Sequence, residues 1–281
     1  TRTSVAAQIN AFLINIFKCF SKINCITLTS ALKPWIDCLT RLTQSGNFYG
    51  RSPKKREQWA QGLEIERYGK QDYLFFVGDV GAFDTRGQEI ARSVLRCLKQ
   101  NDISFGHLGA AEISDGNEAH AMGETELFRH LAEKNIQTFN ALGVQQIITL
   151  SPHGFHVIKN EYPQLGGNYQ VFHYSQILAP ALEKAAFRDD LPPVRVTYHD
   201  SCYLGRHNQE YVSARKMLSA VPGLKMVEME RGFQNSLCSL FLRLSSLSSG
   251  PRSFLFLILD DAACVDSWCI TIQYRMNEWH T

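Results

Sequence analysis

The sequence lacks a strong charge of either sign. Its 281 residues include 29 lysines and arginines and 27 aspartates and glutamates, which leaves a net charge of +2. A nearly balanced chain has no electrostatic reason to bind nucleic acid or another polyanion, so we predict no nucleic-acid partner. The short basic run Lys54-Lys55-Arg56 is interpreted as a solvated loop.

Long uninterrupted apolar runs are also missing. The stretch at residues 11–32 contains two lysines, and the stretch at residues 237–259 contains two arginines. Charged residues within such stretches argue against a membrane-spanning helix. No segment has the pattern of a cleavable signal peptide, so we expect a cytoplasmic protein.

Closely spaced cysteines, which would indicate a disulfide framework, are absent as well. The eight cysteines lie far apart, at positions 19, 25, 38, 97, 202, 238, 264 and 269. In a reducing cytoplasm, cysteines serve as free thiols or metal ligands rather than in disulfides.

Apolar runs alternate with amphipathic segments through the middle of the chain. The apolar runs predict strands at residues 73–77, 103–108, 146–150, 169–172, 194–198 and 224–229. The amphipathic segments predict helices at residues 86–100, 124–142, 175–187 and 210–220, with a short helix starting near residue 152. This alternation predicts an α/β fold with parallel sheets and crossover helices. Ligands of such sheets bind beyond the carboxyl ends of the strands.

The residues that follow these strands recur at a regular interval. Asp79 and Ser114 are 35 positions apart, and Cys202 and Cys238 are 36 positions apart. Each interval spans a helix, a strand and a loop. The repeat predicts two similar units in tandem, joined near residue 190.

Several short stretches between residues 46 and 238 resemble one family. They are Gly46-Asn47, Trp59-Ala60, Gly62-Leu63, Leu127-Phe128, Ala132-Glu133-Lys134-Asn135-Ile136, Lys159-Asn160-Glu161-Tyr162-Pro163, Gly166-Gly167 and the run from His199-Asp200-Ser201-Cys202 to Asn208. With these stretches the chain resembles the cysteine-rich CCG-domain family of iron–sulfur proteins, which includes iron–sulfur subunits of heterodisulfide reductase and of glycolate oxidase.

The resemblance implies an iron–sulfur cluster, of the 4Fe–4S type, in the second unit. Each unit of the family supplies one cysteine after a strand, a Cys-Cys-Gly about 35 residues later and a Cys-x-x-Cys further on. Cys202 matches the first of these ligands and Cys238 the second. His199 and His207 are candidates to donate hydrogen bonds to a cluster sulfur, although histidines in such turns more often have a structural role. From the residues alone, Cys202 could also be an inert thiol or a nucleophile beside His199.

The first unit departs from the family pattern at every cysteine position. Asp79 replaces the lone cysteine, and Ser114-Asp115-Gly116 replaces the Cys-Cys-Gly. Ser151-Pro152-His153-Gly154 replaces the Cys-x-x-Cys. These side chains predict a variant pocket that binds a hard metal or a polar ligand, or else residues that only cap helices and brace loops.

The second unit departs from the pattern directly after Cys238. The expected Cys-Gly is replaced by Ser239-Leu240, and Cys264 and Cys269 have the wrong spacing for the last ligand pair. We therefore divide the chain into a poorly defined segment 1–45, a first unit 46–190, a truncated second unit 191–238 and an atypical tail 239–281. An altered reading frame or a gene truncation would account for both unusual ends.

Two functions are consistent with this pattern. In the first, the chain is an iron–sulfur oxidoreductase component that passes electrons between a flavoprotein and a quinone, disulfide or similar acceptor, and reaches a membrane only through a partner. In the second, it is a cluster-free α/β module that docks on a redox partner. Two cysteines are too few to hold a four-iron cluster, so loss of the cofactor is compatible with the sequence.

Overall fold

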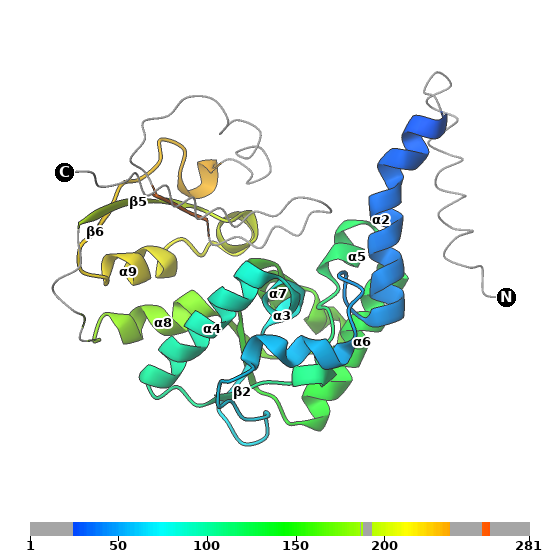
Figure 1. Ribbon diagram of the computed structural model, residues 1–281, viewed down its shortest axis with the longest axis horizontal. Coiled ribbons are helices and arrows are strands. Elements are labelled where there is room, and N and C mark those ends of the chain that lie inside the picture. The colour runs from blue at the N-terminus through cyan, green and yellow to red at the C-terminus, as the bar shows by residue number, and fades with distance from the viewer. Residues whose placement is uncertain (1–24, 186, 188–192, 237–254, 259–281) are drawn as a thin grey trace.

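The structure is a computed structural model that describes residues 25–185, 187, 193–236 and 255–258 (Figure 1). Its elements form two parallel sheets, one after the other along the chain. The α/β fold predicted from the alternation of apolar and amphipathic segments is therefore confirmed.

The first sheet has the strand order β2-β1-β3-β4, and all its pairings are parallel. Its strands are β1 (Tyr73–Phe76), β2 (Phe105–Gly106), β3 (Gln146–Thr149) and β4 (Gln170–His173). Its helices are α3 (Gly78–Phe83), α4 (Thr85–Gln100), α5 (Asn117–Ala121), α6 (Thr125–Ala141), α7 (Pro152–Asn160) and α8 (Tyr174–Leu182). Short 3-10 turns at Pro53–Ala60 (η1), Gly109–Ala111 (η2) and Tyr162–Leu165 (η3) complete this unit.

The first sheet is buried on both faces, as the continuous apolar run of β1 requires. Leu74 and Phe76 face a core that α6, α7 and α2 (Cys25–Ser45) complete. Phe75 faces a second core against α4 and α8. Successive strand residues point to opposite faces, so one short strand contributes to both cores.

The second sheet has the order β6-β5-β7, again entirely parallel. It consists of β5 (Val194–His199), β6 (Leu224–Met226) and β7 (Leu255–Ile258), with helix α9 (Ser213–Ser219) between β5 and β6. A π-helical turn, η4 (Cys202–Arg206), follows β5, and a 3-10 turn, η5 (Phe233–Asn235), follows β6. The strand β7 lies in the segment that the sequence analysis treated as an atypical tail.

The two units are packed together. Helices α8 and α9 lie side by side between the sheets (Figure 1), and α7 contacts η4. Leu204, in the middle of η4, is 1% exposed and belongs to the core of the first unit. The turn that begins with Cys202 is therefore fastened to the first unit by a buried side chain.

Helix α2 was not predicted, since residues 1–45 show no clear periodicity and Pro34 lies within the helix. Its carboxyl-terminal half nevertheless buries Cys38, Leu39 and Leu42 against the first-unit core. Tertiary packing of this face outweighs the weak helix propensity of the local sequence. The segment expected to be poorly defined thus contributes to the core.

Two predicted elements are shorter in the structure than the sequence pattern suggested. The helix predicted at residues 210–220 begins only at Ser213, because the Glu210 carboxylate accepts hydrogen bonds from the Val212 and Ser213 amides. Of the strand predicted at residues 103–108, two residues pair with β1.

Within the part of the chain described, no helix combines the length and the apolar character needed to cross a bilayer.

The close approach of α3 and α4 gives a first prediction. A Cβ on Gly87 would lie 2.4 Å from the carbonyl oxygen of Val80, so Gly87→Ala must separate the two helices. We expect a loss of about 1–3 kcal/mol in the free energy of unfolding, measured by urea denaturation. Gly69→Ala is the control, because no atom lies within 4 Å of its Cβ. Equal stability of the two variants would contradict this account of the packing.

Candidate functional site

The loop after β1 is organised by a buried arginine. Arg56 is 2% exposed, so the prediction that the basic run 54–56 is solvated was wrong for its last residue. Its guanidinium forms ion pairs with Asp79 and with Glu112, the latter at 2.9 Å. A buried charge requires such partners, and two carboxylates from distant parts of the chain provide them.

Backbone amides donate further hydrogen bonds to these two carboxylates. Asp79 accepts a hydrogen bond from the Phe48 amide at 2.9 Å. Glu112 accepts from the amides of Val77 and Gly78 at 3.1 and 2.9 Å. Burial raises the pKa of both carboxyl groups, and Arg56 opposes that rise. The ion pairs and the hydrogen bonds from backbone amides therefore tie the end of β1 to residue 48 and to the loop after β2.

The loop at the Cys-Cys-Gly position is held by two side chains from elsewhere in the unit. The Asn135 side-chain amide donates to the Ser114 carbonyl at 2.9 Å and to the Tyr162 hydroxyl at 3.0 Å. The Tyr162 hydroxyl donates to the Asp115 carbonyl at 3.1 Å. Asn135 and Tyr162 are among the residues that carry the family resemblance, and here they brace the loop.

Two further buried carboxyl groups lie close to this loop. Burial raises the pKa of Asp115 to about 7, and burial together with Asp115 raises the pKa of Glu118 well above its usual range. Burial, followed by Glu118 and Asp79, raises the pKa of the Cys38 thiol to about 12. Cys38 is therefore a neutral thiol beside the carboxyl cluster.

The Ser151 side chain has the capping role given as an alternative in the sequence analysis. Its hydroxyl accepts hydrogen bonds from the amides of His153 and Gly154 at the start of α7. The His153 ring packs on Tyr203 of the second unit, with ring centroids 4.3 Å apart. Asp79 and Asp115 thus lie in the carboxyl cluster, whereas His153 contacts the other unit.

The first-unit pocket does not fit an iron–sulfur cluster. Its ligand positions carry carboxylates and hydroxyls, and Arg56 and backbone amides already bind them. Iron in such clusters requires thiolate ligands. No group of three or more His, Cys, Asp or Glu side chains in the described ranges could hold a metal ion.

The second unit places a thiol at the carboxyl end of its central strand. Cys202 begins η4, three residues after β5 ends, and its sulfur contacts Nη2 of Arg206. Nη1 of the same guanidinium donates to the Ser236 carbonyl at 2.8 Å. Arg206 lies in the run that carries the family resemblance, but the sequence analysis assigned it no role, because nothing in its spacing indicates a contact with Cys202.

Asp200 links this thiol loop to the segment that leads toward Cys238. The Arg215 guanidinium binds both Asp200 oxygens, at 2.6 and 2.8 Å, and also binds Glu228. Asp200 accepts from the Phe233 amide at 2.6 Å, and the Ser236 hydroxyl donates to the Asp200 carbonyl. Residues 233–236 are therefore fastened directly beside the start of η4.

The two predicted histidines flank this turn in the sequence. His199 is buried at the end of β5, and His207 stacks on Tyr203 with a centroid distance of 5.0 Å. His156 of α7 contacts both Tyr203 and His207, and burial, followed by His207, lowers its pKa. These rings are part of the contact between α7 and the residues in and directly after η4.

The remaining cysteines are placed as follows. Cys38 and Cys97 lie within α2 and α4 of the first unit. Cys25 is the first residue of α2, and Cys19, Cys238, Cys264 and Cys269 lie outside the described residues. Cys202 is thus the cysteine that the structure places at a strand's carboxyl end.

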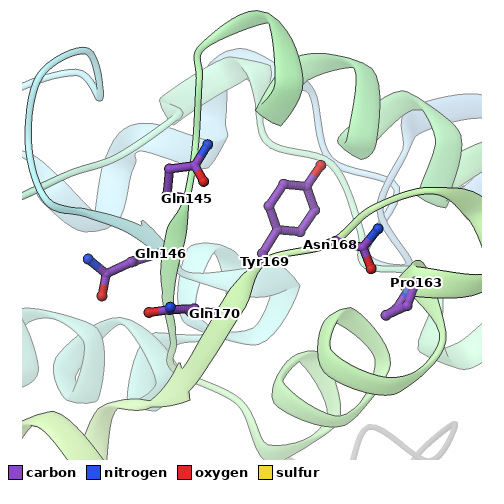
Figure 2. Close-up of a pocket in the computed structure, with 6 residues that line it drawn as sticks. All are labelled: Gln145, Gln146, Pro163, Asn168, Tyr169 and Gln170. Atoms are coloured by element: carbon purple, nitrogen blue, oxygen red, sulfur yellow. The ribbon is translucent and has the colours of Figure 1, made fainter.

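A hollow at the opposite edge of the first sheet lacks chemically reactive groups. Figure 2 shows its lining at the amino ends of β3 and β4, where amide side chains and Tyr169 surround it. The lining residues are Gln145, Gln146, Pro163, Asn168, Tyr169 and Gln170. With no carboxylate, thiol or imidazole, it is a poor candidate for a metal or redox site.

Comparison with known proteins connects the thiol loop to a family. Residues 196–240 match the family model described as CCG, cysteine-rich domain. This match and the relatives below confirm the predicted resemblance. No solved structure matches the chain.

The relatives are named as iron–sulfur or redox proteins. The chain is 37% identical over 211 residues to the probable iron–sulfur-binding oxidoreductase FadF of Bacillus subtilis (71% of this chain, 30% of the relative). It is 40% identical over 172 residues to the EtfAB:quinone oxidoreductase of Syntrophomonas wolfei (60% and 24%). It is 28% identical over 202 residues to one subunit of the dihydromethanophenazine:CoB–CoM heterodisulfide reductase of Methanosarcina barkeri (69% and 49%). The matched part of the chain therefore spans about a quarter to about a half of the length of these relatives.

The buried arginine gives a prediction of stability. Arg56→Met would leave Asp79 and Glu112 as buried, unpaired charges, so we expect the free energy of unfolding to fall by about 3–5 kcal/mol in chemical denaturation. Adding Asp79→Asn and Glu112→Gln should recover much of that loss. Lys216→Met, which removes an exposed ion pair with Glu183, should cost less than about 1 kcal/mol. A similar loss for both single variants would rule out a special role for Arg56.

The raised pKa of Asp115 gives a prediction of pH dependence. The ordinary pKa is 3.8 and the folded-state pKa is about 7, so the folded chain binds an extra proton between these values. The stabilisation is complete below the lower pKa and is lost as pH rises toward 7. Asp115→Asn should therefore flatten the fall in unfolding free energy between about pH 4 and 7. The exposed Asp72→Asn should retain the wild-type profile, and an equally steep profile in Asp115→Asn would contradict the assignment.

Proposed function

Because residues 196–240 match the cysteine-rich CCG domain and the relatives are iron–sulfur oxidoreductases, we propose that this chain is part of an iron–sulfur electron-transfer protein. One observation carries the proposal: Cys202 lies at the carboxyl end of β5, within the matched segment, with its sulfur against a guanidinium. This is the edge of a parallel sheet at which ligands bind.

Cys202 and Cys238 are the proposed ligands from this chain. Ser236 is hydrogen-bonded beside the Cys202 loop, and two residues of chain reach at most about 7 Å. Cys238 lies outside the described residues, and its role as a second ligand rests on the family resemblance. A 4Fe–4S cluster needs more thiolates than these two, which a further segment or another protein chain would have to supply. His199 and His207 are the candidate histidines beside it.

The bound cluster would supply one-electron transfer, and the protein residues would set its environment. A flavoprotein is the proposed electron donor, as the family resemblance implies. A quinone and a heterodisulfide, which occur in the names of relatives, are the proposed classes of acceptor. We place the chain in the cytoplasm, with contact to a membrane only through a partner protein.

The first unit serves as a platform in this proposal. Its variant pocket is filled by the Arg56 ion pairs, and its core receives Leu204 from the thiol loop. We retain the boundaries 46–190 and 191–238 for the two units, and add α2 to the first because its buried face belongs to that core. The platform needs no metal of its own.

A cluster-free docking module is the second candidate. It is favoured by the carboxylate chemistry of the first pocket and by the lack of a three-ligand group among the residues placed by the structure. This function requires the same fold and a partner protein, but no iron.

Iron and acid-labile sulfide distinguish these two functions. After anaerobic reconstitution, we expect the purified chain to contain both elements and to show broad visible absorption. Cys202→Ser should lose most of this absorption, because the hydroxyl is a poor ligand for cluster iron. Cys97→Ser, on the partly buried side of α4, should retain it. A wild-type chain without iron would support the docking module, and full absorption in Cys202→Ser would refute the ligand assignment.

A further inference from the structure

We propose that Arg206 is a positioning residue that clamps residues 233–236 onto the Cys202 loop and points a cationic hydrogen-bond donor at the Cys202 sulfur. This inference rests on the proposed function and adds a residue to it. The basis is a single guanidinium that contacts two segments, each leading to a proposed ligand.

The two contacts use different nitrogens of the same planar group. Nη2 contacts Sγ of Cys202, and Nη1 donates to the Ser236 carbonyl at 2.8 Å. Arg206 and Ser236 are 30 positions apart in the chain. A lysine has one ammonium and lacks the fixed fork that serves two acceptors at once, so it would keep the charge but not the clamp.

The π-helical turn η4 carries both Cys202 and Arg206. The Gly205 amide donates to the Ser201 carbonyl at 2.8 Å, and the His207 amide donates to the Cys202 carbonyl at 3.1 Å. A Cβ on Gly205 would lie 2.5 Å from the Tyr211 ring, so the turn can pack here only with glycine. Buried Leu204 anchors the same turn in the first unit. The side chain of Arg206 therefore starts from a fixed backbone.

The position of the guanidinium has a chemical consequence. Reduction of a cluster adds negative charge, and a cation or donor beside a ligand sulfur stabilises the reduced form. Hydrogen bonds to cluster sulfurs are among the factors that set the reduction potential. Arg206 should thus raise the potential of a cluster bound through Cys202.

The clamp can be tested in the 281-residue chain without a cluster. We would measure amide hydrogen exchange of residues 233–236 by mass spectrometry in the wild type, Arg206→Gln, Arg206→Lys and Arg129→Gln. The Phe233, Asn235 and Ser236 amides all donate hydrogen bonds in the structure, so their exchange reports release of the segment. Loss of a charge-assisted bond should speed exchange about tenfold in both Arg206 variants. Arg129, exposed on α6, is the matched control and should change nothing. Unchanged exchange in Arg206→Gln would overturn the clamp.

The midpoint potential of the reconstituted chain tests the proposed effect of Arg206 on a cluster bound through the Cys202 sulfur. Arg206→Gln should lower the potential, whereas Arg206→Lys should stay close to the wild type because it keeps the positive charge. An equal potential in Arg206→Gln and the wild type would overturn the role toward sulfur. A wild-type chain that takes up no cluster would refute the proposed function and the sulfur role with it, and the exchange experiment would still decide the clamp.

Discussion

The ion pairs of Arg56 with Asp79 and Glu112 are the constraint on which the first unit depends. They join the end of β1, the loop after β2 and the segment around residue 48 at one buried point. Such an arrangement is stable only when every partner is present, because a single unpaired charge in this environment is costly. The family pattern places cysteine ligands at the same loops. In this chain an arginine and carboxylates hold those loops together, so the unit keeps its shape with protein groups alone.

The second unit repeats this principle with other residues. Asp200 follows β5 as Asp79 follows β1, and it is paired with the buried Arg215. Asp200 also binds the Phe233 amide, so the ion pair fixes the segment that approaches Cys238. In both units a carboxylate–arginine pair therefore braces the loop at the carboxyl end of a central strand. The loop of the second unit also carries a thiol, Cys202, whereas the loop of the first unit does not.

Sequence reasoning predicted the parallel strands well, because short apolar runs buried on both faces have a distinctive pattern. It also gave helix capping as one of two roles for Ser151, since a serine before a proline at a helix start has a local cause. It missed the burial of Arg56, whose partners lie 23 and 56 positions away. Glu112, Glu118 and Arg206 were missed for the same reason: their roles depend on long-range packing, which residue type and spacing do not encode. Helix α2 was missed because its sequence shows no clear periodicity and contains Pro34.

Leu204 has a consequence for the order in which the chain is made. The first unit is synthesised before the second, and domains generally fold as they emerge from the ribosome, starting from the amino terminus. The hydrophobic site for Leu204 consists of residues of the first unit, so it can form before η4 emerges. The loop that carries Cys202 can then pack against the folded first unit before its own sheet is complete. The outer strand β7 of that sheet is translated more than fifty residues after Leu204. A unit without cysteines at its ligand positions would in this way act as an internal folding template for the one that carries the thiol.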